Sequence, residues 1–253
     1  MINKNFSVDG PPDIEVRIES GRLEVHEGVP GEVEVTVDTK LPGFIVEQRG
    51  NSILVSSDSD SRWLSRGSAF VVIQAPPGSD LQASVASAGI TVDVDMGKVD
   101  VKSASGDVQV ESAENLIVKT ASGDLEVERV RRALRVASAS GDVRVENVLD
   151  GTISVSTASG DVHIEKCGAA SLNLNTASGD AYVNNFTGRT ASFKSMSGSI
   201  DLGIPAGTSV NLDVNTLSGK IRLPDPEPRR GTPERHMSIT AKLVSGDFTI
   251  ERV

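Results

Sequence analysis

A four-residue motif, Ala-Ser-Gly-Asp with small variations, recurs nine times along this chain and restricts its possible folds more than any other feature. Successive motif glycines lie 17 to 21 residues apart, except for a last interval of 27 residues. A repeat of this length predicts a stack of equivalent structural units, each of which packs only on its neighbours. The glycines, which we expect at structural corners of these units, are Gly89, Gly106, Gly123, Gly141, Gly160, Gly179, Gly198, Gly219 and Gly246.

The segments that flank each motif alternate between apolar and polar residues. Leu116 and Val118 precede Gly123, and Leu125 and Val127 follow it, with one residue between the members of each pair. An alternation with a period of two indicates half-buried β-strands, and no segment of the sequence has apolar residues at helical spacing. The chain is therefore predicted to be all-β.

The short link through each motif allows two arrangements of these strands. A hairpin would produce an antiparallel meander, which leaves one apolar face uncovered because no helix is predicted to cover it. A corner would instead stack equivalent strands in parallel and bury both apolar faces in a narrow interior. Only one Trp, one Tyr and six Phe occur among 253 residues, and a thin aliphatic core suits this scarcity of large rings. We therefore expect a parallel β-helix, or solenoid, with short two-strand coils.

Each residue of the motif has a predicted part in the corner. Glycine permits a positive φ or a close backbone approach, and the Ser and Asp beside it can hydrogen-bond to nearby backbone donors. The residue before Ser is Ala in five copies and Met196, Leu217 or Val244 in the last three, which predicts an interior site that enlarges towards the C-terminus. The Thr and Ser residues one position earlier predict a stacked row of hydroxyl groups.

The aspartates that follow the glycines offer a second interpretation of the corner. They fall at one position of the repeat and would stack along one edge, where Ca²⁺ could relieve their mutual repulsion. Ser199 and Lys220 interrupt the series, and turn hydrogen bonds already explain an Asp after Gly. We expect turn stabilisation, with no metal and no cofactor. The series is Asp107, Asp124, Asp142, Asp161, Asp180 and Asp247.

The first 80 residues are rich in predicted strands but irregular. Ile18–Val25 looks like one more coil, with Gly21 at its corner. We interpret residues 1–80 as an N-terminal β cap with the first irregular coils, and residues 81–253 as the solenoid, because stacked coils need protected ends. Trp63 is expected either to anchor a partner or to cover the end of the core. Prolines between residues 224 and 233 predict a polar surface loop over residues 224–237.

Groups with catalytic potential are scattered through the sequence. His26, His163 and His236 fall at different places with no nucleophile beside them. Cys167 is the only cysteine, which excludes an intramolecular disulfide and a thiolate metal cluster. The net charge of −10 argues against nucleic acid and anionic membranes as general partners. We expect a protein without enzymatic activity.

The outward positions of the predicted strands form two different faces. Positions after the corner carry mixed charges, whereas positions before it are polar and neutral to basic. The second face could bind an extended polymer such as a glycan. It could equally be a solvated surface on which side-chain amides form ladders. Its candidate binding residues are Asn173, Asn175, Asn211 and Asn215.

The motif followed by alternating apolar residues, as in residues 122–127, resembles a large bacterial family of β-strand-repeat domains of unknown function that are often labelled "putative adhesins". The resemblance covers nearly the whole chain and includes Ile18–Val25. It implies a right-handed β-helix and brings no established catalytic residues. Many members of the family are secreted or anchored to membranes.

These observations together predict a scaffold or interaction protein whose ligand the sequence does not name, with a cell-surface adhesin or glycan-binding module as the alternative. No secretory signal opens the sequence, and no stretch approaches the about 18 apolar residues of a transmembrane helix. We expect a cytoplasmic protein if Met1 is the native start, with the cell surface as the alternative location. The expected partner is a protein or a glycan, and the solenoid ends offer a route to a homo-oligomer.

Overall fold

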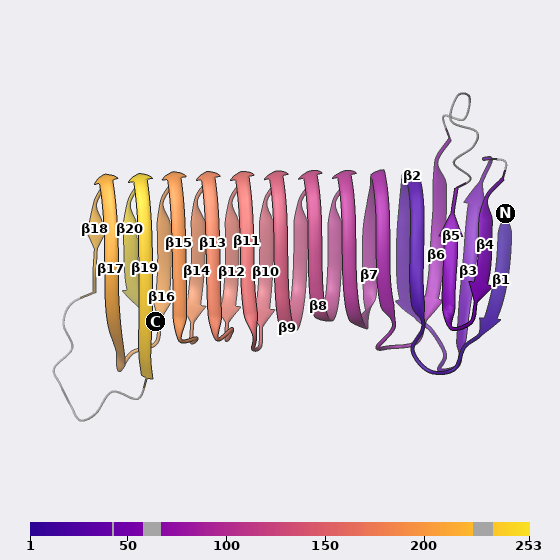
Figure 1. Ribbon diagram of the computed structural model, residues 1–253, viewed down its shortest axis with the longest axis horizontal. Coiled ribbons are helices and arrows are strands. Elements are labelled where there is room, and N and C mark those ends of the chain that lie inside the picture. Colours follow the sequence, from indigo (N-terminus) through magenta and orange to yellow (C-terminus); the bar gives the residue numbers. More distant parts are fainter. Residues whose placement is uncertain (42, 58–66, 225–234) are drawn as a thin grey trace. The chain divides into compact units, whose positions relative to one another are not determined.

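The computed structural model describes residues 1–41, 43–57, 67–224 and 235–253, and every regular element in these ranges is a β-strand (Figure 1). The all-β prediction is thereby confirmed. The chain divides into two compact units, residues 1–126 and residues 127–253. The predicted domain boundary after residue 80 stays a prediction; β7 begins at that point.

The first unit combines parallel and antiparallel pairing. β2 pairs in parallel with β5, β6 and β7, and β7 pairs in parallel with β8. β1 with β3, β3 with β6, and β4 with β5 are antiparallel pairs. The coil expected over Ile18–Val25 lies within β2, where Gly21 has a φ of +126°. The strands are β1 (Ile2–Ser7), β2 (Asp13–Glu27), β3 (Glu32–Thr39), β4 (Ile45–Arg49), β5 (Ser52–Ser56), β6 (Ala69–Ala75), β7 (Asp80–Ser105) and β8 (Val108–Ser122).

The second unit is built from equivalent strands in parallel register. Ile153 of β11 lies beside Leu134 of β9 on one side and Leu172 of β13 on the other, and neighbouring strands keep this register residue by residue. The strands are β9 (Leu125–Ser140, which begins just before the unit), β10 (Val143–Val148), β11 (Thr152–Ser159), β12 (Val162–Cys167), β13 (Ser171–Ser178), β14 (Ala181–Phe186), β15 (Thr190–Ser197), β16 (Ile200–Ile204), β17 (Thr208–Ser218), β18 (Ile221–Arg222), β19 (Arg235–Ser245) and β20 (Phe248–Arg252).

The last repeats of the second unit do not follow chain order. We use "repeat" for the two strands that are joined at one motif glycine. β19 pairs with β15 on one side and with β17 on the other, and β20 likewise pairs with β16 and β18 (Figure 1). The β19–β20 repeat therefore lies between the β15–β16 and β17–β18 repeats. The 27-residue interval between the last two motif glycines gives the chain enough length to return to this position.

Small aliphatic side chains fill the interior of both units. Val, Ile and Leu at alternate strand positions are almost completely buried, and Phe186, Phe193 and Phe248 add three buried rings in the second unit. The rings of Phe193 and Phe248 have their centroids 6.2 Å apart. Because β-strands alternate their side chains between two faces, this pattern follows directly from the alternation in the sequence.

The predicted interior site before the motif serine is wrong. Met196, Leu217 and Val244 have exposed fractions of 64%, 81% and 50%. The period of two continues through the end of the strand, so the Thr or Ser one position earlier takes the inward place and the next residue points outward. Ser195 is accordingly buried. The predicted row of hydroxyl groups is inward, but individual hydroxyls donate to carbonyl groups near their own corner, as Thr157 does to the carbonyl of Ser159 at 2.9 Å.

Two predicted segments are only partly described. Residues 235–237 belong to β19, so the predicted end of the proline-rich loop at residue 237 is wrong. Residues 225–234, which make up most of that loop, lie outside the described residues, as does Trp63. The handedness of the winding stays a prediction.

Candidate functional site

A row of glycines forms the corner edge of the second unit. In the second unit the φ angles of the motif glycines range from +118° to +146°. A β-carbon on Gly160 would also collide with the carbonyl group of Gly141, and the same collision would occur between each later motif glycine and its spatial neighbour. The order along this row is Gly141, Gly160, Gly179, Gly198, Gly246 and Gly219.

Gly89 does not occupy the corner that the motif predicts for it. Its φ is not positive, and no atom lies within 4 Å of a β-carbon placed on it. The corner position is held by Ala88, which lies beside Gly21 and whose carbonyl approaches Gly106. This copy of the motif reads Ser-Ala-Gly, so its glycine falls one residue later than in the other copies. The backbone at Ala88 continues within β7, which explains why a residue with a β-carbon fits there.

The corner aspartates join one repeat to the next. The carboxylate of Asp142 accepts a hydrogen bond from the backbone N–H of Asp161 at 2.9 Å, and that of Asp161 accepts one from Asp180 at 2.8 Å. The bond is therefore made across the stack instead of within the turn. Lys220 replaces the aspartate in the β17–β18 repeat, which is the last of the stack among the described residues. Its backbone N–H donates to Asp247 at 2.8 Å, and no further described repeat needs an acceptor from its side chain.

The hydrogen bonds of the corner aspartates weaken the argument for Ca²⁺ at this edge. One carboxylate oxygen of each bonded aspartate accepts a backbone N–H, which offsets the repulsion that a cation would otherwise relieve. No group of three or more His, Cys, Asp or Glu side chains suited to a metal ion occurs among the described residues. The corner edge is thus held by amide donors from the neighbouring repeat.

The four asparagines of the predicted binding face lie on one sheet of the second unit, in two separate pairs. Asn173 and Asn175 are on β13, and Asn211 and Asn215 are on β17, with β15 and β19 between them. Side-chain amide contacts on this face are long, such as 3.4 Å from Asn175 Nδ2 to Ser156 Oγ. One row across the face, named here the polar row, consists of Ser156, Asn175, Lys194, Lys242 and Asn215.

The polar row contains two adjacent lysines that chain order does not bring together. Lys194 and Lys242 are register partners on β15 and β19, and both are exposed. The sequence does not predict Lys242 beside Lys194, because a stack in chain order would place β17 between β15 and β19. The insertion of β19 therefore makes the centre of the face basic, while Asp213 lies on the neighbouring row beside Thr240.

An aromatic cluster on the opposite sheet of the second unit was not predicted. The rings of His163 and Tyr182 have centroids 6.1 Å apart. Glu165 Oε2 accepts a 2.6 Å hydrogen bond from Asn184 Nδ2 and lies 3.3 Å from His163 Nε2. The Tyr182 hydroxyl donates to Asp180 at 3.3 Å, and partial burial together with the charge of Asp180 raises the pKa of Tyr182. A ring flanked by an amide and carboxylates can stack on a sugar and bind its hydroxyl groups.

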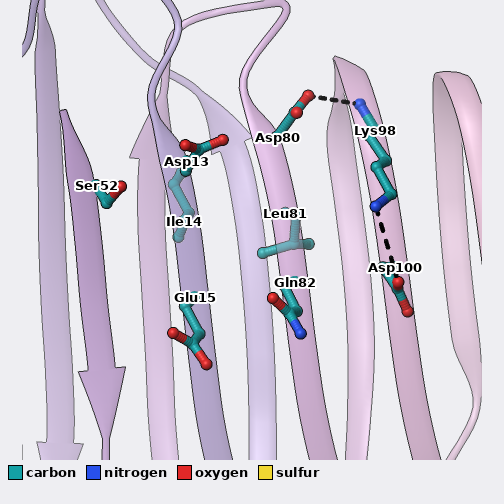
Figure 2. Close-up of a pocket in the computed structure, with 9 residues that line it drawn as sticks. All are labelled: Asp13, Ile14, Glu15, Ser52, Asp80, Leu81, Gln82, Lys98 and Asp100. Carbon is teal, nitrogen blue, oxygen red and sulfur yellow. Dashed lines mark hydrogen bonds and ion pairs between the residues drawn. The ribbon is translucent and has the colours of Figure 1, made fainter.

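A shallow acidic groove lies on the first unit (Figure 2). It has a volume of about 300 Å³ and a floor that includes the buried side chains of Ile14 and Leu81. Lys98 is the one cation among its lining residues; its backbone N–H donates to Asp80 at 2.7 Å, and its Nζ lies 4.0 Å from Asp100. The remaining lining residues are Asp13, Glu15, Ser52 and Gln82. Segments of β2, β5 and β7 meet here, with β2 in parallel register with β5 and with the start of β7, so no local sequence signal marks the groove.

The remaining groups of chemical interest are dispersed. Burial raises the pKa of the Cys167 thiol to about 12, so this side chain stays protonated. His26 lies 3.4 Å from Glu24 and 3.3 Å from Asp93 on the surface of the first unit, and His236 is exposed on β19. The described part of the chain contains no helix long and apolar enough to cross a membrane.

Comparison with known proteins places the chain in a family. It is similar to a "putative adhesin" from Parabacteroides distasonis, with 17% identity, coverage of 100% of this chain and 96% of that chain, and a TM-score of 0.44. It is also similar to a "putative adhesin" from Bacteroides fragilis, with 12% identity, coverage of 98% and 96%, and a TM-score of 0.43. No curated protein matches the sequence. The family model described as Toastrack DUF4097 matches residues 12–252, so this chain belongs to the Toastrack family, and the resemblance inferred from the motif is confirmed.

Proposed function

We propose that this chain is a non-enzymatic interaction scaffold that binds an extended partner, a protein or a glycan, on the outward face of β11, β13, β15, β19 and β17. The observation that carries the proposal is the polar row, in which five consecutive strands align Ser, Asn and Lys side chains in register. Equivalent side chains on neighbouring strands lie about 4.8 Å apart, which presents a regular set of donors to a linear ligand. We also infer the right-handed winding that the family implies.

The chemistry of the described residues supports a role without catalysis. The one thiol is buried with a raised pKa, and the histidines lie apart, each beside carboxylates or exposed. A covalent mechanism needs a nucleophile within hydrogen-bonding reach of a base, and neither arrangement supplies one. Cytoplasmic and cell-surface locations both remain compatible with such a scaffold, and fractionation of cells that express the full gene distinguishes them.

A binding measurement with matched variants tests the polar row. The chain would be applied to an array of bacterial glycans and to isolated bacterial envelopes, and compared with Lys194→Glu/Lys242→Glu. The control Arg144→Glu/Lys166→Glu makes the same charge change on exposed positions of the opposite sheet. We expect the polar-row variant to lose binding about tenfold or more while the control retains it. Equal binding by both variants, or no binding by the unaltered chain, would contradict the proposal.

The aromatic cluster favours a second candidate function, binding of a short glycan around Tyr182. Its basis is the ring pair of His163 and Tyr182 beside the hydrogen-bonded Glu165 and Asn184. Tyr182→Ala should abolish glycan binding, whereas Tyr182→Phe keeps the stacking surface and should retain most of it. If the Lys194→Glu/Lys242→Glu variant binds normally while Tyr182→Ala does not, the glycan site belongs to this cluster and not to the polar row.

A further inference from the structure

β17 is an edge strand of the second unit. It pairs in register with β19 over Thr208–Ser218, and no strand among the described residues pairs with its opposite edge (Figure 1). Unpaired N–H and C=O groups along such an edge are a template for another strand. Natural edge strands are commonly blunted by Lys, Pro or an inward charge. Residues 208–216 carry one charge, Asp213, and it points outward.

The interior is incompletely covered at this edge. The inward residues of β19, Ile239 and Ala241, are completely buried, whereas Leu212 and Val214 at the equivalent places of β17 are only half-buried. Ile221 and Leu223, which follow the same corner, have exposed fractions of 44% and 54%. An apolar edge of this kind marks an interaction surface, because covering it removes apolar area from water.

The sequence of β17 has a two-fold pattern about Leu212. Read outward in both directions, Asn211 corresponds to Asp213, Val210 to Val214, Ser209 to Asn215, and Thr208 to Thr216. Antiparallel pairing of two copies with Leu212 on the axis would therefore place Thr on Thr, Val on Val and Leu on Leu. It would also place each Asn211 opposite Asp213 of the partner subunit, which is an amide against a carboxylate. An axis on Asp213 would instead set two carboxylates face to face, which is destabilising.

We propose that β17 pairs antiparallel with β17 of a second copy of this chain, with Leu212 on the two-fold axis. The same edge serves both subunits, so the assembly closes as a dimer and does not propagate into a fibre. The paired strands satisfy the free backbone groups of both edges, and Leu212 and Val214 of each copy cover Leu212 and Val210 of the partner subunit. This interface uses the strand edge and leaves the outward polar row accessible, so it does not depend on the proposed binding function.

Mass measurement in solution tests the interface and its register. Sedimentation equilibrium of the full chain should show a concentration-dependent dimer. Asn211→Asp would oppose two pairs of carboxylates across the axis and should raise the dimer dissociation constant about tenfold. The matched control Asn173→Asp makes the same change on β13, away from the edge, and should leave the constant unchanged.

A charge exchange makes the test specific for the axis. The double variant Asn211→Asp/Asp213→Asn restores an amide opposite each carboxylate and should recover the dimer, and circular dichroism verifies that all variants are folded. A monomer at every concentration overturns the proposal. A dimer that Asn211→Asp leaves intact also overturns it, because the contact must then lie elsewhere. A series of larger species overturns it as well, because it indicates head-to-tail assembly.

Discussion

Four glycines separate the two requirements of the corner, which are a positive φ and the absence of a β-carbon against the neighbouring repeat. Gly89 has neither a positive φ nor a neighbour within 4 Å of an added β-carbon, and Gly207 has a φ of +72° with nothing within 4 Å. Gly188 has no positive φ, but its β-carbon would collide with the carbonyl of Ala169 and with the Phe186 ring. Gly160 combines a φ of +118° with the collision at its neighbouring glycine.

Replacement of each glycine by Ala should give a graded loss of stability. Gly89→Ala is expected to be neutral or to stabilise by about 0.5 kcal/mol, because Ala restricts the unfolded chain. Gly207→Ala should cost about 1 kcal/mol for a left-handed conformation. Gly188→Ala should cost about 2 kcal/mol for overpacking. Gly160→Ala should cost at least about 3 kcal/mol, because the conformational and steric terms act together.

Urea unfolding followed by circular dichroism measures these differences. The slope of the transition must be the same in all four variants, because repeat proteins can unfold in parts and a changed slope would make the free energies incomparable. Equal losses for Gly89→Ala and Gly160→Ala would refute both the corner geometry and the assignment of the first corner to Ala88. A cost at Gly160 no larger than at Gly207 would refute the collision between adjacent corners.

Three further predictions concern other groups. Asp161→Ala should destabilise the second unit by about 1 to 2 kcal/mol, because it leaves the N–H of Asp180 without its acceptor, whereas Ser199→Ala should change stability by less than about 0.5 kcal/mol in the same urea assay. The pKa of Tyr182 is raised in the folded chain, which therefore keeps the phenol protonated to a higher pH than the unfolded chain does. The stability linked to this proton is complete below the ordinary pKa of 10.0 and is lost as the pH rises through the pKa of the folded chain. Ultraviolet titration should show a phenolate that forms above the ordinary pH range and disappears in Tyr182→Phe; a titration at the ordinary value would contradict the contact with Asp180. Cys167, with a pKa of about 12, should react with a thiol reagent only after unfolding, and rapid labelling of the native chain would place it at the surface instead.

Much of the fold follows from local alternation. Leu116, Val118, Leu125 and Val127 are all buried as the period of two requires. The same rule, applied through the end of each strand, would have placed Met196 outward. The error arose because a shift from Ala to larger apolar residues was interpreted as packing, although exposed positions tolerate such residues singly.

Other features needed information that no single segment contains. The position of β19 between β15 and β17 results from long-range strand pairing, and the spacing of the motif does not determine which strand edges pair. The pairing of Lys194 with Lys242, and with it the basic centre of the polar row, follows from this order. The acidic groove on the first unit likewise depends on the register of β2, β5 and β7. The two-fold pattern of β17, by contrast, is present in the sequence and becomes meaningful only once β17 is known to be an edge.

The place of β19 and β20 also affects how the second unit is assembled during synthesis. These strands leave the ribosome after β17 and β18, yet they occupy the space between that pair and the strands made before it. The edge of β15 and β16 therefore stays unpaired until the last segment of the unit has been synthesised, and β17 has no native neighbour before then. A chain that ends shortly before residue 235 would lack β19 and β20, so the edge of β15 and β16 would stay unpaired, and such an exposed edge favours aggregation.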